Sequence, residues 1–183
     1  GPLRPFTADR AGMRLGEGYG VFIVERAGDA KARGARPLAR ILGWGGASDA
    51  HHLTQPAPDG RGAARAIREA TRALEPSQRL PGLIAAHATS TPANDAAEYS
   101  ALSAAFGDRL RDVPVTALKS RIGHTLGAAG AVELAVVLAA MEQSKSPAAA
   151  NAETDGESFP DLDLLHEGSR VGCVEHAAVV SLG

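Results

Sequence analysis

Two loops of this sequence carry the residues best suited to chemistry. Residues 86–92 read AHATSTP and contain His87, and residues 119–127 read KSRIGHTLG and contain His124. Each loop follows a short apolar run, so both histidines are expected at the carboxyl ends of strands, where open α/β sheets bind ligands. Two converging imidazoles can hold one oxygen between two N–H donors, which suits reactions that build negative charge on a carbonyl. The nucleophile for such chemistry is not evident, so the sequence predicts half of an active site.

A lysine and a glutamate are predicted to support the second loop. Lys119 lies five residues before His124, and Glu133 falls among alanines and valines in the apolar segment that follows. A buried carboxylate needs a partner, because an unpaired buried charge is costly. We therefore expect Lys119 to pair with Glu133, close enough to orient an imidazole or to hold local charge.

The remaining candidates favour ordinary structural roles. The glycines of residues 16–20 precede an apolar run, whereas a phosphate-binding loop follows a strand and opens a helix, so tight packing is the better interpretation. His51 and His52 are adjacent and point apart, and no further ligands stand at helical or hairpin spacing. We predict no metal site there, and place these histidines in a loop near a substrate opening. Cys173 is predicted to be a buried structural thiol, because no base or basic residue lies near it in the sequence.

The elements that position the two loops are readable from hydrophobic periodicity. Apolar runs bounded by glycine predict strands, and amphipathic or apolar stretches with capping residues predict helices. A helix is expected to be capped by Asn94, and the helix after His124 is apolar nearly all round, which places it in a protein interior. The strands are expected over residues 20–25, 38–43, 82–87, 113–118 and 179–182, and the helices over 27–34, 59–74, a segment starting at 94, and 127–143. This alternation predicts a layered α/β fold, with a mixed, mostly parallel sheet and helices on both faces.

Composition excludes several classes of protein. The 183 residues are 44% hydrophobic, 4% aromatic and carry a formal charge of −2, which argues against a nucleic-acid groove. The sequence is interpreted as having no run of about 18 apolar residues, so no membrane span is predicted. The single cysteine is consistent with a reducing, cytoplasmic setting.

At the two histidine loops the chain resembles the β-ketoacyl synthases, the condensing enzymes of fatty acid and polyketide synthesis with a thiolase-like fold. The resemblance covers residues 1–183 and corresponds to the C-terminal half of the family. The motifs that carry it include PFTADRAG at residues 5–12, SDAHHLT at 48–54, and the two histidine loops. Ala88 departs from the pattern, because the family usually has glycine there. Arg121 and Ile122 resemble the polyketide-type version of the second loop.

The resemblance implies a role for each site residue. His87 and His124 would assist decarboxylation of a malonyl thioester and stabilise the enolate, with Lys119 as the active-site lysine supported by Glu133. Thr89 and Thr91 would hydrogen-bond the phosphopantetheine arm of an acyl carrier protein. No cofactor of its own is implied, since the substrates travel on that arm. The nucleophilic cysteine belongs to the N-terminal half of the family and is not expected in this chain.

Three interpretations stay open at this point. The chain is a component of a 3-oxoacyl-ACP synthase that works with a cysteine-bearing half or a partner ketosynthase chain, and is inactive alone. Alternatively, it is a non-catalytic partner similar to chain-length factors, or an inactive fragment. The resemblance implies a homodimer or heterodimer for the complete enzyme, and neither nucleic acid nor membrane as a partner.

Overall fold

A computed structural model describes residues 2–76, 79–145, 147–151, 155–167 and 172–182. Its centre is a four-stranded sheet in the order β3-β2-β1-β4, and every pairing is parallel. The strands are β1 (Ile84–Ala85), β2 (Pro114–Thr116), β3 (Asp163–Leu164) and β4 (Ala178–Val179). The α-helices are α1 (Ala27–Ala32), α2 (Arg61–Thr71), α3 (Pro92–Phe106), α4 (Lys119–Ile122) and α5 (Ala129–Gln143), with 3₁₀ turns η2 (Gly107–Asp112) and η3 (Leu126–Ala128).

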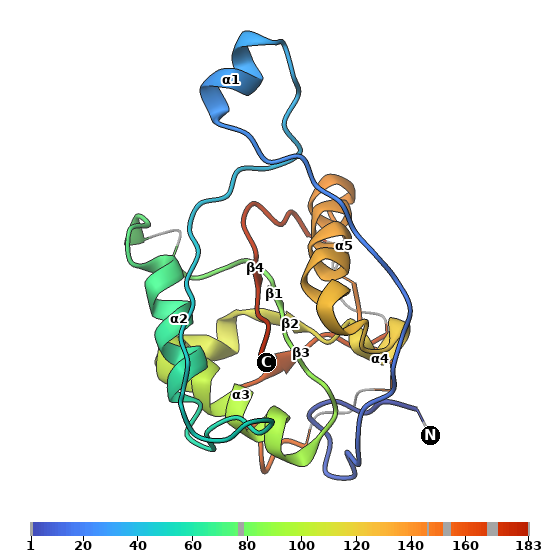
Figure 1. The fold of residues 1–183 in the computed structure, drawn as a ribbon. Helices are drawn as coiled ribbons and strands as arrows, with labels where there is room; N and C mark the ends of the chain where they lie inside the picture. Colours follow the sequence, from blue (N-terminus) through green and yellow to red (C-terminus); the bar gives the residue numbers. More distant parts are fainter. Residues whose placement is uncertain (1, 77–78, 146, 152–154, 168–171, 183) are drawn as a thin grey trace.

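Helices cover both faces of the sheet, as Figure 1 shows. Ile84 and Val115 point to one face and share a fully buried cluster with Leu102 of α3 and Ile67 of α2. Ala85 points to the opposite face and packs with Val137 of α5. Because neighbouring residues of a strand face opposite sides, apolar residues in succession are buried on both faces. The predicted layered α/β fold is confirmed, and the observed pairings are all parallel.

The central elements follow the sequence pattern closely. The structure confirms a helix within each of the ranges 27–34, 59–74 and 127–143, and a strand within each of 82–87 and 113–118. The last strand, β4, begins one residue before the predicted range of 179–182 and ends at Val179. The strands are shorter than predicted, at two or three residues. The helix predicted to be capped by Asn94 begins earlier, at Pro92. Thr91 is its cap, because its Oγ1 accepts the Asn94 N–H at 3.3 Å.

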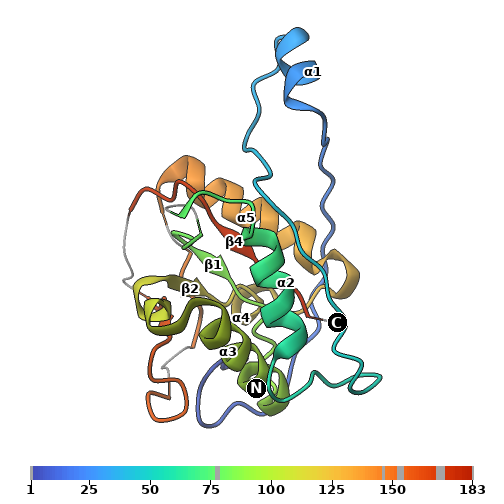
Figure 2. The ribbon, with the colours of Figure 1, turned by 90° about the vertical axis from the view of Figure 1, so that its left-hand side faces the viewer.

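The two strands predicted over residues 20–25 and 38–43 are not formed. Both segments are extended and lie outside the sheet. They flank α1, which projects from the body of the molecule (Figure 2). We call residues 20–44 the arm. The apolar side chains of the arm are exposed, with Ile23 at 87% and Trp44 at 79%. The residues have strand-forming side chains, but in the described part of the chain no strand pairs with them, so their backbone is extended without a ladder.

Helix α5 is the apolar helix of the sequence, and this chain buries only part of it. The window Leu126–Gln143 is long and apolar enough by composition to cross a membrane, which corrects our sequence interpretation, and 22% of it is buried. Glu133 lies in the middle of this window, fully enclosed and ion-paired with Lys119. A charged pair enclosed by protein is the mark of a core helix, since an intramembrane charge is expensive. The outer face of α5 is therefore apolar surface that this chain leaves open.

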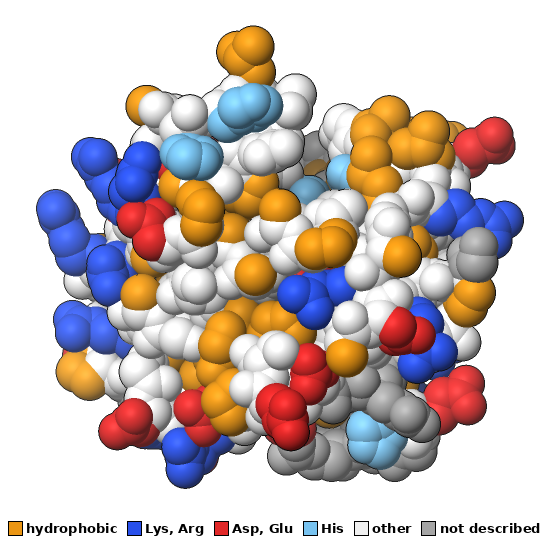
Figure 3. Space-filling model, turned by 90° about the horizontal axis from the view of Figure 1, so that it is seen from below, with side chains coloured by type: hydrophobic (Ala, Val, Ile, Leu, Met, Phe, Trp, Pro, Cys, Tyr) orange, Lys and Arg blue, Asp and Glu red, His pale blue; other side chains and the backbone are white. Residues whose placement is uncertain are grey.

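Two further surface features bear on the predictions. Cys173 is exposed, so the prediction of a buried thiol was wrong. Seen from below, basic side chains gather along the left edge, the side of α2, and hydrophobic side chains are spread in groups across the face (Figure 3). Helix α2 presents Arg65 and Glu69, and Arg72 follows at its C-cap, all three exposed, which is typical of a solvated helix face.

Candidate active site

The His87 loop runs from β1 to α3 and is almost completely buried. The side chain of His87 is 4% exposed, and its neighbours Ala88 and Ser90 are at 0% and 1%. Ala88 and Ser90 both have left-handed backbone angles, with φ of 42° and 66°. Such angles strain any residue with a side chain, so surrounding contacts must hold this loop in place.

Two carboxylates of α3 provide those contacts. Glu98 is fully buried and accepts the backbone N–H groups of His87 and Ala88 at 2.6 and 2.7 Å. Asp95, also at 0%, accepts the Ser90 N–H at 3.1 Å. The two residues are three apart, so they lie on one face of the helix. Helix α3 therefore fixes the strained loop through hydrogen bonds from the backbone N–H groups of the loop to carboxyl oxygens.

The sequence alone did not predict this function of Asp95 and Glu98. Acidic residues near the start of a helix favour its dipole, but here both side chains are fully buried and accept hydrogen bonds from the loop before the helix. The sequence does contain a signal for this loop support, namely an apolar strand, a histidine, a Pro at the first helical position and two carboxylates on one helical face. Only the strained loop geometry explains why carboxylates are needed there, and that geometry is not readable from residue types.

The His124 loop connects α4 to η3 and α5 and is more open. Its imidazole is partly exposed, and Leu126 beside it is 57% exposed. The Leu126 N–H donates to His124 Nδ1 at 3.2 Å. An Nδ1 that accepts a hydrogen bond leaves the proton on Nε2, so the Nε2–H of a neutral His124 is the available donor.

The two imidazoles meet as predicted. Their ring centroids are 5.2 Å apart, and the planes are nearly perpendicular at 89°. Nδ1 of His87 is buried and, among the described residues, has no hydrogen-bond partner. Two residues 37 positions apart are thus brought to one point by adjacent parallel strands, β1 and β2.

Lys119 and Glu133 form the predicted ion pair beneath the histidines. Lys119 Nζ and Glu133 Oε1 are 2.5 Å apart, and both side chains are 1% exposed. Glu133 Oε2 has no hydrogen-bond partner among the described residues. The pair places a buried cation next to the two imidazoles without leaving it uncompensated.

Electrostatics keep both histidines neutral near pH 7. Burial, and then the charge of Lys119, lower the pKa of His87 to about 3. Burial and Lys119 also lower the pKa of His124. A neutral imidazole can donate one N–H to a developing oxyanion without first losing a proton. Burial raises the pKa of Glu133, with Lys119 acting in the opposite direction.

Burial also perturbs the carboxylates of α3. The pKa of Glu98 is raised to about 7 because desolvation outweighs its two N–H donors. Burial likewise raises the pKa of Asp95, against the hydrogen bonds that it accepts. Both groups therefore resist ionisation more than an exposed carboxylate does.

The two threonines lie between these features. Their hydroxyl oxygens are 3.0 Å apart, with Thr89 nearly buried and Thr91 capping α3. They stand two and four residues after His87, in the same loop. Their assignment to phosphopantetheine stays a prediction.

The other histidines lie elsewhere. His51 and His52 are exposed in an irregular loop, where the His52 Nδ1 accepts the Thr54 N–H at 3.1 Å. His176 bonds through Nε2 to the Leu80 carbonyl at 2.8 Å. Within the described part of the chain, no three metal-ligating side chains come together.

Comparison with known proteins agrees with this geometry. Residues 38–153 match the beta-ketoacyl synthase C-terminal domain. The chain belongs to the β-ketoacyl synthase family. It is 39% identical over 180 residues to 3-oxoacyl-(acyl-carrier-protein) synthase 2 of Synechocystis sp., covering 98% of this chain and 43% of that protein. It is 42% identical over 164 residues to the tetracenomycin polyketide synthase ketoacyl synthase alpha subunit of Streptomyces glaucescens, covering 88% and 37%.

Solved ketosynthase structures share the fold. One is a type II polyketide synthase acyl carrier protein in complex with its ketosynthase bound to the hexaketide, with a TM-score of 0.88 and 31% identity over 96% of this chain and 43% of that chain. Another is the ishigamide ketosynthase/chain length factor, with a TM-score of 0.85 and 36% identity over 95% and 42%. The chain thus spans less than half the length of the relatives that it matches.

Proposed function

We propose that this chain supplies the histidine side of a 3-oxoacyl-(acyl-carrier-protein) synthase site. In that reaction an acyl group is transferred to a cysteine, a malonyl thioester loses CO₂, and the resulting enolate carbon attacks the acyl thioester and releases the cysteine thiolate. The observation that carries the proposal is the pair of neutral imidazoles, His87 and His124, with ring centroids 5.2 Å apart beside a buried Lys119–Glu133 pair.

The chemistry required of these residues is stabilisation of an enolate. When CO₂ leaves, negative charge moves onto the thioester oxygen, and preorganised N–H donors lower the energy of that state. The Nε2–H of His124 is free to donate because its Nδ1 is engaged by Leu126. Lys119 adds positive charge nearby, and burial strengthens its effect. Thr89 and Thr91 would orient the phosphopantetheine arm of the carrier protein. Because the substrates travel on that arm, the protein would need no cofactor of its own.

The cysteine is proposed to come from a segment outside this chain. The apolar surface of the arm and the outer face of α5 support this, because large exposed apolar patches mark association sites. Relatives that are more than twice as long provide the kind of segment that would cover it. We therefore propose that a cysteine-bearing half or partner chain packs here and that the isolated chain is inactive. The assembled enzyme is proposed to be a dimer in the cytoplasm, and an acyl carrier protein is proposed to deliver its substrates.

Reconstitution tests the function directly. The chain is co-expressed with the cysteine-bearing half of a related synthase, and 3-oxoacyl product from malonyl and acyl carrier protein is measured by mass spectrometry. We expect product from the assembly and none from either part alone. His87→Ala and His124→Ala should each lower the rate at least about 100-fold, as for loss of an oxyanion donor, whereas the exposed control His166→Ala should not.

A surface control tests the proposed partner. Ile23→Asp, on the arm, should prevent co-purification of the two parts, whereas Leu53→Asp, also at an exposed apolar residue but outside the arm, should leave it unchanged. Assembly with normal acylation of the partner cysteine but no dependence on either histidine would instead favour a non-catalytic partner of the chain-length-factor kind.

A further inference from the structure

One segment near the start of the chain touches both histidine loops. We infer that residues 4–16, which we call the strap, form a positioning segment that sets how the His87 and His124 loops lie relative to each other. This inference deepens the proposed site and rests on it for its functional meaning, but its evidence is purely structural.

At one end the strap is bonded to the His87 loop. The Arg4 N–H donates to Ser90 Oγ and the Gly12 N–H donates to the Ser90 carbonyl, both at 2.9 Å. Asp95 joins the two segments, since its Oδ2 accepts the Phe6 N–H at 2.9 Å and its Oδ1 accepts the Ser90 N–H at 3.1 Å. One buried carboxylate therefore holds the strap and the strained loop together.

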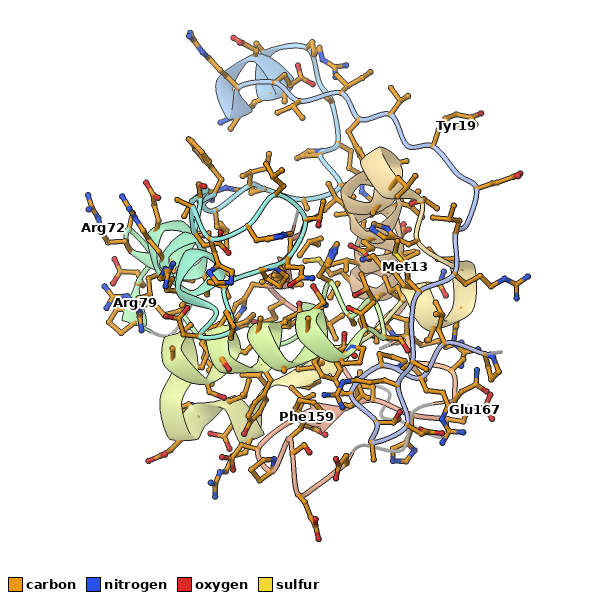
Figure 4. The ribbon with its side chains drawn as sticks, turned by 60° about the horizontal axis from the view of Figure 1, so that its bottom comes forward. Met13, Tyr19, Arg72, Arg79, Phe159 and Glu167 are labelled. Atoms are coloured by element: carbon orange, nitrogen blue, oxygen red, sulfur yellow. The ribbon has the colours of Figure 1, made fainter. Side chains whose placement is uncertain are left out.

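Aromatic packing anchors this end of the strap. Phe6 is completely buried and contacts Phe159 edge-on, with ring centroids 5.4 Å apart. The guanidinium carbon of Arg10 lies 4.9 Å from the centroid of the Phe159 ring. Figure 4 places Phe159 below α3, on the side opposite the arm. Because the anchor is part of the main core, the strap has a fixed starting point.

At its other end the strap pairs with the His124 loop. The His124 N–H donates to the Arg14 carbonyl at 2.7 Å, and the Gly16 N–H donates to the His124 carbonyl at 3.0 Å, which forms a parallel bridge at Leu15. The backbones nearly touch: a Cβ on Gly16 would lie 2.1 Å from the Ile122 carbonyl oxygen, and one on Gly123 would lie 2.8 Å from Gly16. Only glycine at position 16 permits this approach.

The two contacts are only a few residues apart along the strap. Gly12 is hydrogen-bonded to the His87 loop and Arg14 to the His124 loop. Because these two residues are only two positions apart, a displacement of one loop is passed to the other through a short stretch of main chain. The strap therefore couples the positions of the two imidazoles in a way that neither loop does alone.

Hydrogen exchange of the His124 amide tests the coupling. Asp95→Asn weakens the strap at its Phe6 end. The Asp95 side chain accepts hydrogen bonds from Phe6, Ser90 and Asn94, which all lie outside the second loop. We expect the amides of His124 and Gly16 to exchange about tenfold faster, corresponding to the loss of about one hydrogen bond, with amides of α2 unchanged. Unchanged exchange at His124 would overturn the inference.

A glycine series tests the close approach independently. In Gly16→Ala the proton contact between the two imidazole rings, measured by NMR, should be lost. In Gly18→Ala the added Cβ meets only side-chain methyl groups, at 3.3–3.4 Å, so the ring contact should weaken less. In Gly28→Ala the added Cβ meets open space, so the ring contact should be kept. A folded Gly16→Ala with the ring contact intact would contradict the inference, and if that variant does not fold, the exchange result for Asp95→Asn decides. Neither measurement requires condensing activity, so a failed reconstitution leaves this test standing.

Discussion

The two histidine loops are held in different ways. The His87 loop is buried, strained and fixed by side-chain carboxylates of α3, whereas the His124 loop is partly exposed and fixed by main-chain pairing with the strap. The first loop is completed by this chain alone. The second has exposed apolar side chains beside its histidine, with Ile122 at 39% and Leu126 at 57% exposed. The difference indicates that the site is enclosed on the side of His87 and more exposed to solvent on the side of His124.

The support beneath the second loop should give the largest effect on stability. Glu133→Ala leaves the Lys119 cation buried without a partner, and we expect the free energy of unfolding to fall by about 3–5 kcal/mol. Urea denaturation measures this. The double variant Lys119→Met/Glu133→Leu should recover most of the loss, because it removes both charges. A loss below about 1 kcal/mol for Glu133→Ala would mean that the pair is solvated and the site less enclosed than described.

The clamp of the first loop should come next. Glu98→Ala leaves the buried N–H groups of His87 and Ala88 without an acceptor, so we expect a loss of about 2–4 kcal/mol. Glu98→Gln, which keeps one acceptor oxygen, should lose less. Glu142→Ala, at an exposed position of α5, serves as the control and should change stability by no more than about 0.5 kcal/mol. Equal losses of stability for Glu98→Ala and Glu142→Ala would show that the His87 loop keeps its conformation without Glu98.

The neutrality of His87 predicts a pH dependence. Its pKa in the folded protein, about 3, lies below its ordinary value of 6.5, so between these values the unfolded chain binds a proton that the folded chain does not. The contribution of His87 to stability is therefore present above pH 6.5 and is lost as the pH falls. Relative to His87→Gln, the wild-type chain should lose about 2 kcal/mol between pH 7 and pH 5 in urea denaturation. Parallel pH profiles would contradict a buried neutral imidazole.

The smallest effect should come from Ala88. Glycine at this position would relieve the left-handed backbone angle of 42°. Ala88→Gly is therefore expected to raise stability by about 0.5–1 kcal/mol, seen as a higher Tm, while Ala86→Gly in the same buried run should lower it. A lower Tm for Ala88→Gly would place the strain elsewhere in the loop.

The sequence predicted the inner fold well and its outer part poorly, for physical reasons. Residues 82–87 and 113–118 are apolar, and this chain itself buries them between helices, so their pattern and their environment agree. Residues 20–25 and 38–43 have the same pattern, but no described segment pairs with them, and a strand requires a partner that local sequence does not supply. The histidine pair and the Lys119–Glu133 pair were predictable from strand ends and from the cost of burying charge. The strap was not, because its contacts join residues far apart in the sequence, and the main-chain bonds among them leave no mark in the residue types.

Histidine NMR tests the central claim most directly. With ¹⁵N-labelled histidine, the ring nitrogens of His87 and His124 report protonation and tautomer, and ring-to-ring proton contacts report their proximity. We predict that at pH 7 both imidazoles are neutral, that His124 carries its proton on Nε2, and that the two rings are in contact at the observed centroid separation of 5.2 Å. A doubly protonated ring at pH 7, or rings without contact, would contradict the proposed pair of oxyanion donors.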